Sequence, residues 1–248
     1  MNGQALVANS PFQPNSWAYD PDTPPVKRDI QQARQLLDRA GWRAPARTPD
    51  NPELPEASKT GIGEYDAIRL KNGVPLSFTL LVSTDQVEVA RQVANQWRVV
   101  GVSAQVQPVQ VGLASNYLQA RQYQAAVANL ALDTPDPDPY PFWHETRAAA
   151  GQNYSQFKDR DLSEVLESAR RTIDMTERTE LYRKFTQMFN DLAPSIVLYY
   201  PLYSYGVSER IRGVQLGPLL APSDRFQTVA DWFVIERRVI VNSGQFVP

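Results

Sequence analysis

The chain has 248 residues, enough to bury the core of one large domain or two small ones. Its 25 basic and 27 acidic residues give a net charge of -2 without a cluster of Lys and Arg, a balance that argues against a nucleic-acid partner. The chain contains no cysteine, which excludes thiol catalysis, thiolate zinc sites and disulfides.

No apolar run approaches the roughly 20 residues that a membrane-spanning helix needs. The first five residues, Met-Asn-Gly-Gln-Ala, lack the basic and apolar regions of a signal peptide. We therefore expect either a cytoplasmic protein or a chain whose N-terminus is not the natural one.

The N-terminal part is predicted to contain an extended strap, a helix and a long surface excursion. Residues 10–25 are rich in proline and show no helical or strand period, as expected for a strap that lies on another part of the protein. Asp29 is a candidate N-cap, apolar residues then recur at helical spacing, and Gly41 ends the helix. Residues 43–72 are predicted to form the excursion, which ends in the turn 71–73.

The middle of the chain predicts a βαβ unit followed by a buried strand. Residues 76–82 form a strand, an amphipathic helix begins at Asp85 and stops at Gly101, and residues 102–109 alternate as the next strand. A helix is expected over residues 113–122. Residues 125–132 are apolar nearly throughout, which favours a central strand covered on both faces.

Two helices and a strand are predicted after residue 160. One helical stripe consists of Leu162, Val165, Leu166, Ala169 and Ile173, and a second of Leu181, Phe185, Met188, Phe189 and Leu192. Asp174, with Glu177 three residues later, is typical of a capping box at the start of the second helix. Residues 195–200 then read as a buried strand.

The most informative stretch is 133–144, which places three carboxylates and three aromatic rings directly after the predicted strand 125–132. Its alternating prolines favour an extended backbone that needs no hydrogen-bond ladder. In open α/β sheets, ligands bind beyond the carboxyl ends of the strands, so the stretch is interpreted as a recognition surface. Its candidate residues are Asp133, Asp136, Asp138, Tyr140, Phe142, Trp143 and His144.

Several chemistries are weighed for this stretch. A calcium loop is disfavoured because there is no glycine at a sharp turn and no bidentate Glu at the required offset. A glycosidase needs two carboxylates on either side of the bond that it cleaves, and the sequence does not identify the second one. Asp138 is best explained as a turn former, whereas Asp133 is a candidate functional carboxylate. His144 is the only histidine, so neither a catalytic triad nor a histidine-rich metal site is expected. We expect His144 to be a surface or hydrogen-bonded histidine.

The ring of Trp143 either stacks on a ligand or packs under the loop, and the sequence leaves both open. No phosphate-binding glycine loop follows a strand. We therefore predict no cofactor and no metal.

Several motifs, in this order, resemble one family over about residues 10–215. They are residues 17–21, the helix 29–42 ending in Leu-Leu-x-x-Ala-Gly-Trp, residues 73–76, the loop 133–137, residues 153–157, and the helix 178–194 leading into 195–199. They are similar to the extracellular solute-binding proteins of family 5, the peptide, dipeptide and nickel receptors of ABC importers.

The resemblance implies the C-terminal half of such a receptor. The expected fold is an α/β lobe of the type II periplasmic-binding-protein kind, with a mixed central sheet flanked by helices. It further implies a strap or hinge segment at 1–25, the ligand-binding lobe at 26–212, with its excursion at 43–72, and a segment at 213–248 that returns to a first lobe outside this chain. With half of the cleft, the chain is expected to bind ligand weakly.

By this resemblance Asp133 pairs with the α-amino group of a peptide ligand, and Asp136, Tyr140 and Trp143 are further ligand-binding candidates. The Trp usual before that Asp is replaced by Asn129-Leu130, which leaves a sugar or another solute open. The implied function is solute binding, not catalysis, in an extracytoplasmic receptor that serves an ABC permease. A membrane is expected to be contacted only through a lipid anchor that this chain lacks.

Two alternatives remain open. One is a hydrolase that acts on sugars or peptides through Asp133 and a second carboxylate such as Glu145. The other is a plain interaction domain.

Overall fold

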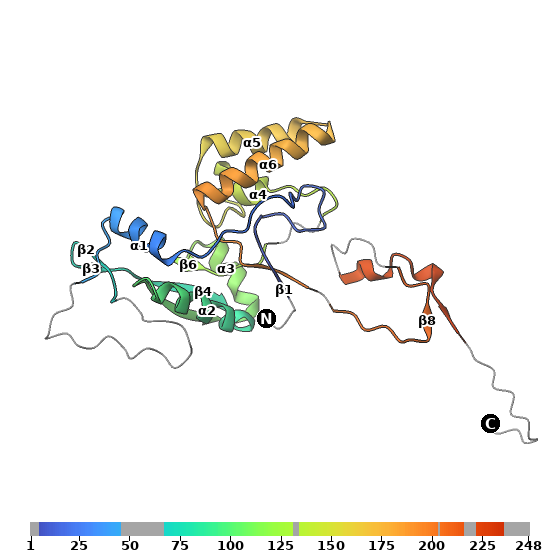
Figure 1. The fold of residues 1–248 in the computed structure, drawn as a ribbon, viewed down its shortest axis with the longest axis horizontal. Coiled ribbons are helices and arrows are strands. Elements are labelled where there is room, and N and C mark those ends of the chain that lie inside the picture. Colours follow the sequence, from blue (N-terminus) through green and yellow to red (C-terminus); the bar gives the residue numbers. More distant parts are fainter. Residues whose placement is uncertain (1–4, 46–66, 131–133, 203, 216–221, 236–248) are drawn as a thin grey trace, which may run out of the picture. The chain divides into compact units, whose positions relative to one another are not determined.

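The computed structural model describes residues 5–45, 67–130, 134–202, 204–215 and 222–235 (Figure 1). The contacts divide the chain into two compact units. Unit 1 comprises residues 1–25, 132–139 and 164–248, and unit 2 comprises residues 26–131 and 140–163. The limits of the predicted domains, at residues 25 and 213, stay predictions.

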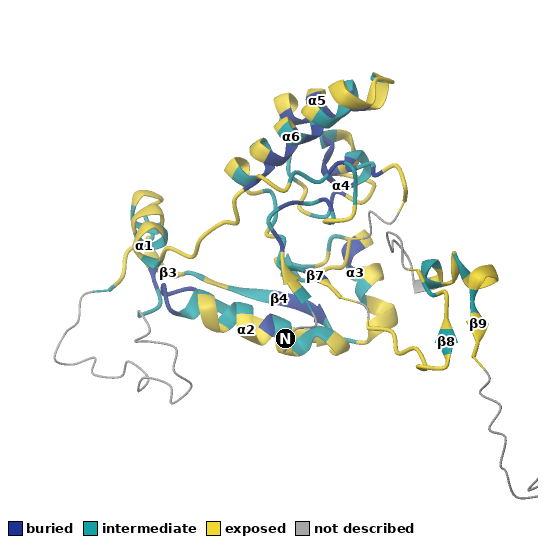
Figure 2. Cartoon of the chain, turned by 45° about the vertical axis from the view of Figure 1, so that its right-hand side comes forward, coloured by how far each residue is buried: buried dark blue, intermediate teal, exposed yellow. Residues whose placement is uncertain are grey.

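Unit 2 is built around a three-stranded parallel sheet. Its strands are β4 (Ser77–Ser83), β5 (Ser103–Val109) and β6 (Ala125–Ala126), in the order β5-β4-β6. The short helix η1 (Thr84–Gln86) and α2 (Val87–Arg98) connect β4 to β5, so the predicted βαβ unit is confirmed. The core of this unit contains Leu80, Val82 and Ala90, and the buried part of β4 is dark blue in Figure 2.

The predicted central strand 125–132 is wrong in place, and over its described residues, 125–130, it is shorter than expected; residues 131 and 132 lie outside the described residues. β4 occupies the centre of the sheet, and β6 is a two-residue strand at its edge. The hydrogen bond from Val127 N to Leu81 O (2.8 Å) is the last of this pairing among the described residues, and residues 128–130 are exposed. The run is rich in alanine, and its apolar character does not by itself decide where a strand pairs.

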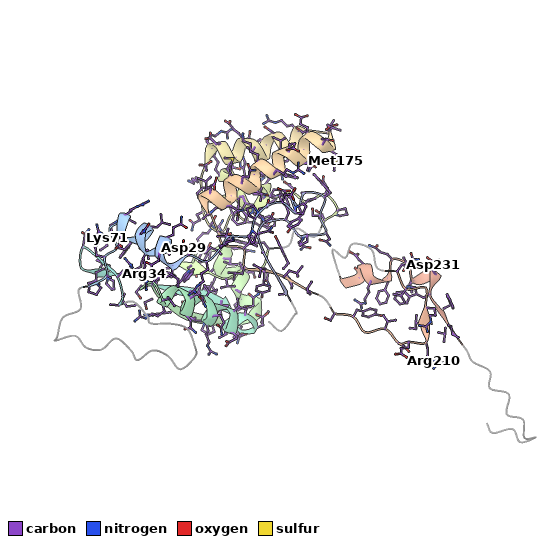
Figure 3. The ribbon with its side chains drawn as sticks, in the orientation of Figure 1. Asp29, Arg34, Lys71, Met175, Arg210 and Asp231 are labelled. Atoms are coloured by element: carbon purple, nitrogen blue, oxygen red, sulfur yellow. The ribbon has the colours of Figure 1, made fainter. Side chains whose placement is uncertain are left out.

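The start of unit 2 follows its local sequence signals. Helix α1 (Ile30–Arg39) begins where the Asp29 carboxylate accepts a hydrogen bond from Gln32 N at 2.8 Å, and Asp29 is labelled in Figure 3. Gly41 follows it with a φ of 86°. The hairpin of β2 (Leu70–Lys71) and β3 (Val74–Pro75) turns through Asn72 and Gly73, both at positive φ, as the predicted turn requires.

Four short helices complete unit 2 before the helical pair. They are η2 (Val111–Leu113), α3 (Ala114–Gln119), α4 (Tyr140–Trp143) and η3 (Glu145–Arg147). The predicted helix 113–122 corresponds to α3 and is shorter than expected. Much of the predicted excursion, residues 46–66, lies outside the described residues.

Unit 1 is centred on α6 (Met175–Leu192), which the N-terminal strap covers. Strand β1 (Ala5–Val7) pairs antiparallel with β7 (Tyr199–Pro201). Phe12 is fully buried, with its ring centroid 4.9 Å from that of Tyr182 and 5.9 Å from that of Phe185. The Asp174 carboxylate accepts a hydrogen bond from Glu177 N at 2.8 Å, which confirms the predicted start of α6.

The two predicted helical stripes are largely confirmed. On α5 (Arg160–Arg171) the buried members are Leu162, Val165, Leu166 and Ala169. Ile173 follows the helix and is 94% exposed, so its inclusion was wrong. The predicted strand 195–200 is also wrong in extent, because Ile196 is 62% exposed and, among the described residues, only the segment Tyr199–Pro201 pairs with a strand.

The C-terminal part of unit 1 contains a small two-stranded sheet. Strands β8 (Ile211–Arg212) and β9 (Phe233–Val234) pair antiparallel, and η4 (Pro222–Phe226) and η5 (Val229–Asp231) lie between them in the sequence. Gly213 has a φ of 79° directly after β8. Among the described residues, no helix combines the length and the apolar character of a membrane span.

Candidate functional site

The candidate stretch 133–144 is shared between the two units. Asp133, the first ligand-binding candidate, lies outside the described residues. Residues 134–139 belong to unit 1 and residues 140–144 to unit 2. The two parts are therefore described separately.

In unit 1, the acidic loop 134–139 is attached to the protein through its backbone carbonyls. The indole Nε1 of Trp17 donates a hydrogen bond to Pro135 O at 3.1 Å, and the Tyr182 hydroxyl donates one to Pro137 O at 3.0 Å. Pro137 is fully buried. Because prolines have no N–H to donate, this loop is poorly suited to a strand ladder, in which its carbonyls would find donors. Side-chain donors from the strap and from α6 bind the carbonyls of Pro135 and Pro137 instead.

Two arginines bind the carboxylates of the same loop. Arg178 Nη1 lies 2.9 Å from Asp136 Oδ1, and Arg170 Nε lies 3.1 and 3.0 Å from the two carboxylate oxygens of Asp138. The Asp136 side chain remains 65% exposed, and its predicted role as a ligand contact stays a prediction. Asp138, which was interpreted as a turn former, also carries an ion pair.

Arg178 makes further contacts within unit 1. Its Nη2 donates to the Tyr182 hydroxyl at 3.1 Å, and its Cζ lies 5.2 Å from the Trp17 ring centroid and 5.4 Å from that of Tyr182. Burial lowers the pKa of Arg178, but the hydrogen bonds to Asp136 and Tyr182 outweigh it and leave the pKa raised. Burial raises the pKa of Tyr182, and its hydrogen bond from Arg178 offsets part of that rise.

In unit 2, the aromatic part of the stretch is packed into the protein. Tyr140 stacks on His144 with ring centroids 4.0 Å apart, and Arg147 Cζ lies 5.6 Å from the Tyr140 ring. His144 is 1% exposed, and its Nδ1 lies 2.8 Å from Thr146 Oγ1, so the hydrogen-bonded interpretation holds. Trp143 is 4% exposed, which favours packing over stacking on a ligand.

Glu145, the second carboxylate of the hydrolase alternative, is ion-paired in unit 2. Its Oε1 lies 3.1 Å from Arg160 Nη1, and its side chain is 27% exposed. The described residues contain no group of three or more His, Cys, Asp and Glu side chains arranged to hold a metal ion.

Sequence reasoning did not assign the side chains that hold the acidic loop: Trp17, Arg170, Arg178 and Tyr182. Trp17 was noted only as part of a motif, although an indole in a proline-rich strap carries an N–H group that usually finds a hydrogen-bond acceptor. Arg178 and Tyr182 are four residues apart and so share one face of α6. Arg178 is 42 residues away from Asp136, and no local pattern connects them.

Comparison with known proteins places these elements in a family. A model of the bacterial extracellular solute-binding proteins, family 5 Middle, matches residues 1–152. The oligopeptide-binding protein AppA of Bacillus subtilis is 25% identical over 225 residues, covering 88% of this chain and 38% of AppA. The dipeptide-binding protein of Escherichia coli is 23% identical over 228 residues, covering 88% of this chain and 37% of that protein.

Solved structures share the fold. AppA of B. subtilis in complex with a nonapeptide superposes with a TM-score of 0.69 at 22% identity, covering 95% of this chain and 44% of AppA. DppA of Helicobacter pylori with the peptide STSA gives 0.67 at 21% identity, covering 94% of this chain and 40% of DppA. NikZ of Campylobacter jejuni with Ni(L-His) also gives 0.67 at 21% identity, covering 93% of this chain and 44% of NikZ.

These structures confirm the predicted fold class, an α/β lobe of the type II periplasmic-binding-protein kind. The chain spans about two fifths of the length of the curated relatives that it matches, 38% of AppA and 37% of the E. coli protein. The family model, in contrast, matches well over half of this chain, residues 1–152 of 248. By that match, the chain belongs to the bacterial extracellular solute-binding proteins of family 5.

Proposed function

We propose that this chain is part of the ligand-binding lobe of an extracytoplasmic receptor that delivers peptides to an ABC importer. The observation that carries the proposal is the acidic loop 134–139, in a chain that belongs to a solute-binding family. Side chains of the strap and of α6 bind both the backbone carbonyls and a carboxylate of this loop. Relatives of this chain are named for oligopeptides, dipeptides and tripeptides, which favours a peptide over a sugar as the solute.

The proposed contact with the ligand is a charge pair at the start of this loop. Asp133 directly precedes Thr134 and is proposed to accept hydrogen bonds from the α-amino group of the peptide. Every peptide with a free N-terminus carries this ammonium group, so the contact orients the ligand without reading its side chains. Asp136, Tyr140 and Trp143 stay proposed ligand contacts, and the burial of Trp143 leaves its ring little exposed surface.

Binding in a whole receptor is proposed to need more than this chain. A cleft closed by a second lobe removes water from the charge pair and strengthens it, because the attraction between charges rises as the effective dielectric constant falls. The permease of the importer is the proposed protein partner. A sugar remains an outcome that the binding experiment distinguishes.

Catalysis is not part of the proposal. A glycoside hydrolase needs one carboxyl group that stays protonated as a general acid. Glu145, the carboxylate considered for that role, is instead engaged in an ion pair with Arg160 at 3.1 Å. The family is one of solute-binding proteins, which points the same way.

The test is peptide binding by the purified whole receptor that contains this chain, measured by isothermal titration. Trialanine is compared with N-acetyl-trialanine, which lacks the ammonium group, and with a disaccharide. Since a hydrogen bond to a charged group contributes about 1.5–3 kcal/mol, we expect Asp133→Asn to weaken trialanine binding by roughly 10- to 150-fold. Asp191→Asn, which changes an exposed carboxylate of α6, serves as the matched control and should leave the affinity unchanged.

Two results would contradict the proposal. One is equal affinity for trialanine and its acetylated form, or a preference for the disaccharide. The other is cleavage of the peptide, followed by chromatography, that Asp133→Asn abolishes.

A further inference from the structure

His144 is a buried histidine of unit 2 that takes no part in the proposed function. Its side chain is 1% exposed, and it is the only histidine of the chain. We propose that His144 is an acid-sensitive latch between α4 and η3, which is closed while the imidazole ring is neutral and opens when the ring is protonated. The inference does not rest on the proposed function, and all its contacts lie within unit 2.

The latch closes on the backbone of η3. His144 directly precedes this helix in an extended conformation, and its side chain is the N-cap. The Thr146 N–H donates a hydrogen bond to Nδ1 at 3.2 Å, and the Thr146 hydroxyl oxygen lies 2.8 Å from the same atom. Because a backbone N–H can only donate, Nδ1 carries no proton, and the proton of the neutral ring is on Nε2.

Protonation of the ring breaks the contact with the backbone. In the imidazolium both ring nitrogens carry a proton, so Nδ1 can donate to the Thr146 hydroxyl but can no longer accept from the Thr146 N–H. An N-terminal amide of η3 then loses its acceptor. Histidine is the side chain that ordinarily changes its charge between pH 5 and pH 8, so mild acid is the signal to which this contact responds.

His144 also joins three segments of unit 2, so that its movement affects more than one turn. Tyr140 of α4 stacks on the imidazole ring with ring centroids 4.0 Å apart. The backbone carbonyl of His144 accepts hydrogen bonds from Asn153 Nδ2 at 3.2 Å and from Arg147 N at 3.0 Å. Opening of the latch is therefore transmitted to α4, to η3 and to the segment that contains Asn153.

The charged groups around the latch are three arginines and two carboxylates. With the titratable tyrosines, the groups of the surrounding elements are Tyr140 of α4, Glu145 and Arg147 of η3, Asp159 and Arg160 at the start of α5, Tyr154 after η3, and Arg121, which lies over the Tyr154 ring. Both carboxylates have other partners: Glu145 Oε1 lies 3.1 Å from Arg160 Nη1, and Asp159 accepts a hydrogen bond from Leu162 N at 2.8 Å. Arg147 Cζ lies 5.6 Å from the Tyr140 ring that stacks on His144. Since positive charge prevails in this set, a further positive charge on the ring favours opening.

Solvent can reach the latch from the side of η3. Thr146 and Arg147 are exposed, although the His144 ring is buried. A local opening of η3 brings Nδ1 into contact with water, where it can take up a proton while the rest of unit 2 stays folded. Returning the charged ring to its buried position costs free energy, so acid keeps the latch open.

The first experiment is amide hydrogen exchange of the whole chain at pH 7.5 and pH 5, with each rate divided by that of an unstructured peptide at the same pH. We expect the protection of the Thr146 amide to be about fivefold lower at pH 5, the effect of losing one N-cap. The Ser103 amide, which binds Leu76 O in the sheet of unit 2, should keep its protection. An unchanged Thr146 amide, or an equal loss at Thr146 and Ser103, would overturn the proposal.

His144→Asn is the matched variant, because an Asn side chain can cap a helix but does not titrate. The protection of its Thr146 amide should be the same at both pH values. The tautomer of the unchanged protein is a test that needs no variant: nitrogen-15 NMR at pH 7.5 should show the proton of the His144 ring on Nε2. The latch is contradicted if that proton is on Nδ1, or if the response of the Thr146 amide to acid persists in His144→Asn.

Discussion

Phe12 is fully buried where the N-terminal strap packs against α6, and Phe12→Ala tests that packing. Transferring its ring from water contributes about 1.5–3 kcal/mol. The ring contacts with Tyr182 at 4.9 Å and Phe185 at 5.9 Å each add about 0.5–1.5 kcal/mol. We expect the free energy of unfolding to fall by about 3–4 kcal/mol, within the range for buried Phe→Ala changes.

The assay is urea unfolding of the whole chain, followed by the helical circular dichroism to which α5 and α6 contribute. Phe12→Leu keeps most of the apolar volume and should lose only about 1 kcal/mol. Val7→Ala, at a strap position that is 79% exposed, is the control and should change the stability by less than about 0.5 kcal/mol. A loss below about 1 kcal/mol for Phe12→Ala would refute the view that the strap is part of the core of unit 1.

Two further predictions concern pH and backbone conformation. Burial raises the pKa of Tyr200 to about 12, against about 10 for an unfolded chain, so its stabilising contribution is complete below pH 10 and is lost as the pH rises towards 12. The free energy of unfolding, measured with urea, should be lower at pH 11.5 than at pH 8, and Tyr200 should contribute up to about 2 kcal/mol of that decrease. Tyr200→Phe should remove this contribution. If the stability of both proteins falls by the same amount between the two pH values, the assignment to Tyr200 is contradicted. A Cβ on Gly213 would lie 2.2 Å from Asp231 O, and the φ of Gly213 is 79°, a value that side chains disfavour. Gly213→Ala should therefore speed the amide hydrogen exchange of β8 and β9, whereas Gly206→Ala, where a Cβ meets open space, should not. Unchanged exchange in Gly213→Ala would show that the turn can relax.

The sequence predicted correctly those helix ends and turns that depend on residues only a few positions apart. Asp29 and Gly41 bound α1, Asp174 starts α6, and the turn at 71–73 closes its hairpin, because capping and turn chemistry act over a few residues. The crossover from β4 through α2 to β5 was visible as a change of period.

The positions of the strands in the sheet and the side chains that hold the acidic loop could not be predicted from local sequence signals. The position of β6 at the edge of the sheet depends on its pairing with β4, which joins residues more than 40 positions apart in the chain. The hydrogen bond between Arg178 and Asp136 likewise joins positions 42 apart, and either side chain alone looks like an ordinary surface charge. The sequence therefore indicated the acidic loop, but not the side chains that hold it.

The attachment of the loop through Pro135 and Pro137 has a consequence for sequence variation. Trp17 and Tyr182 bind carbonyl oxygens, which every amino acid carries, so these two contacts do not depend on the side chains of the loop. Substitutions that keep the backbone extended preserve them. The side chains of this loop can therefore change in the course of evolution while the two hydrogen bonds that hold its backbone are kept.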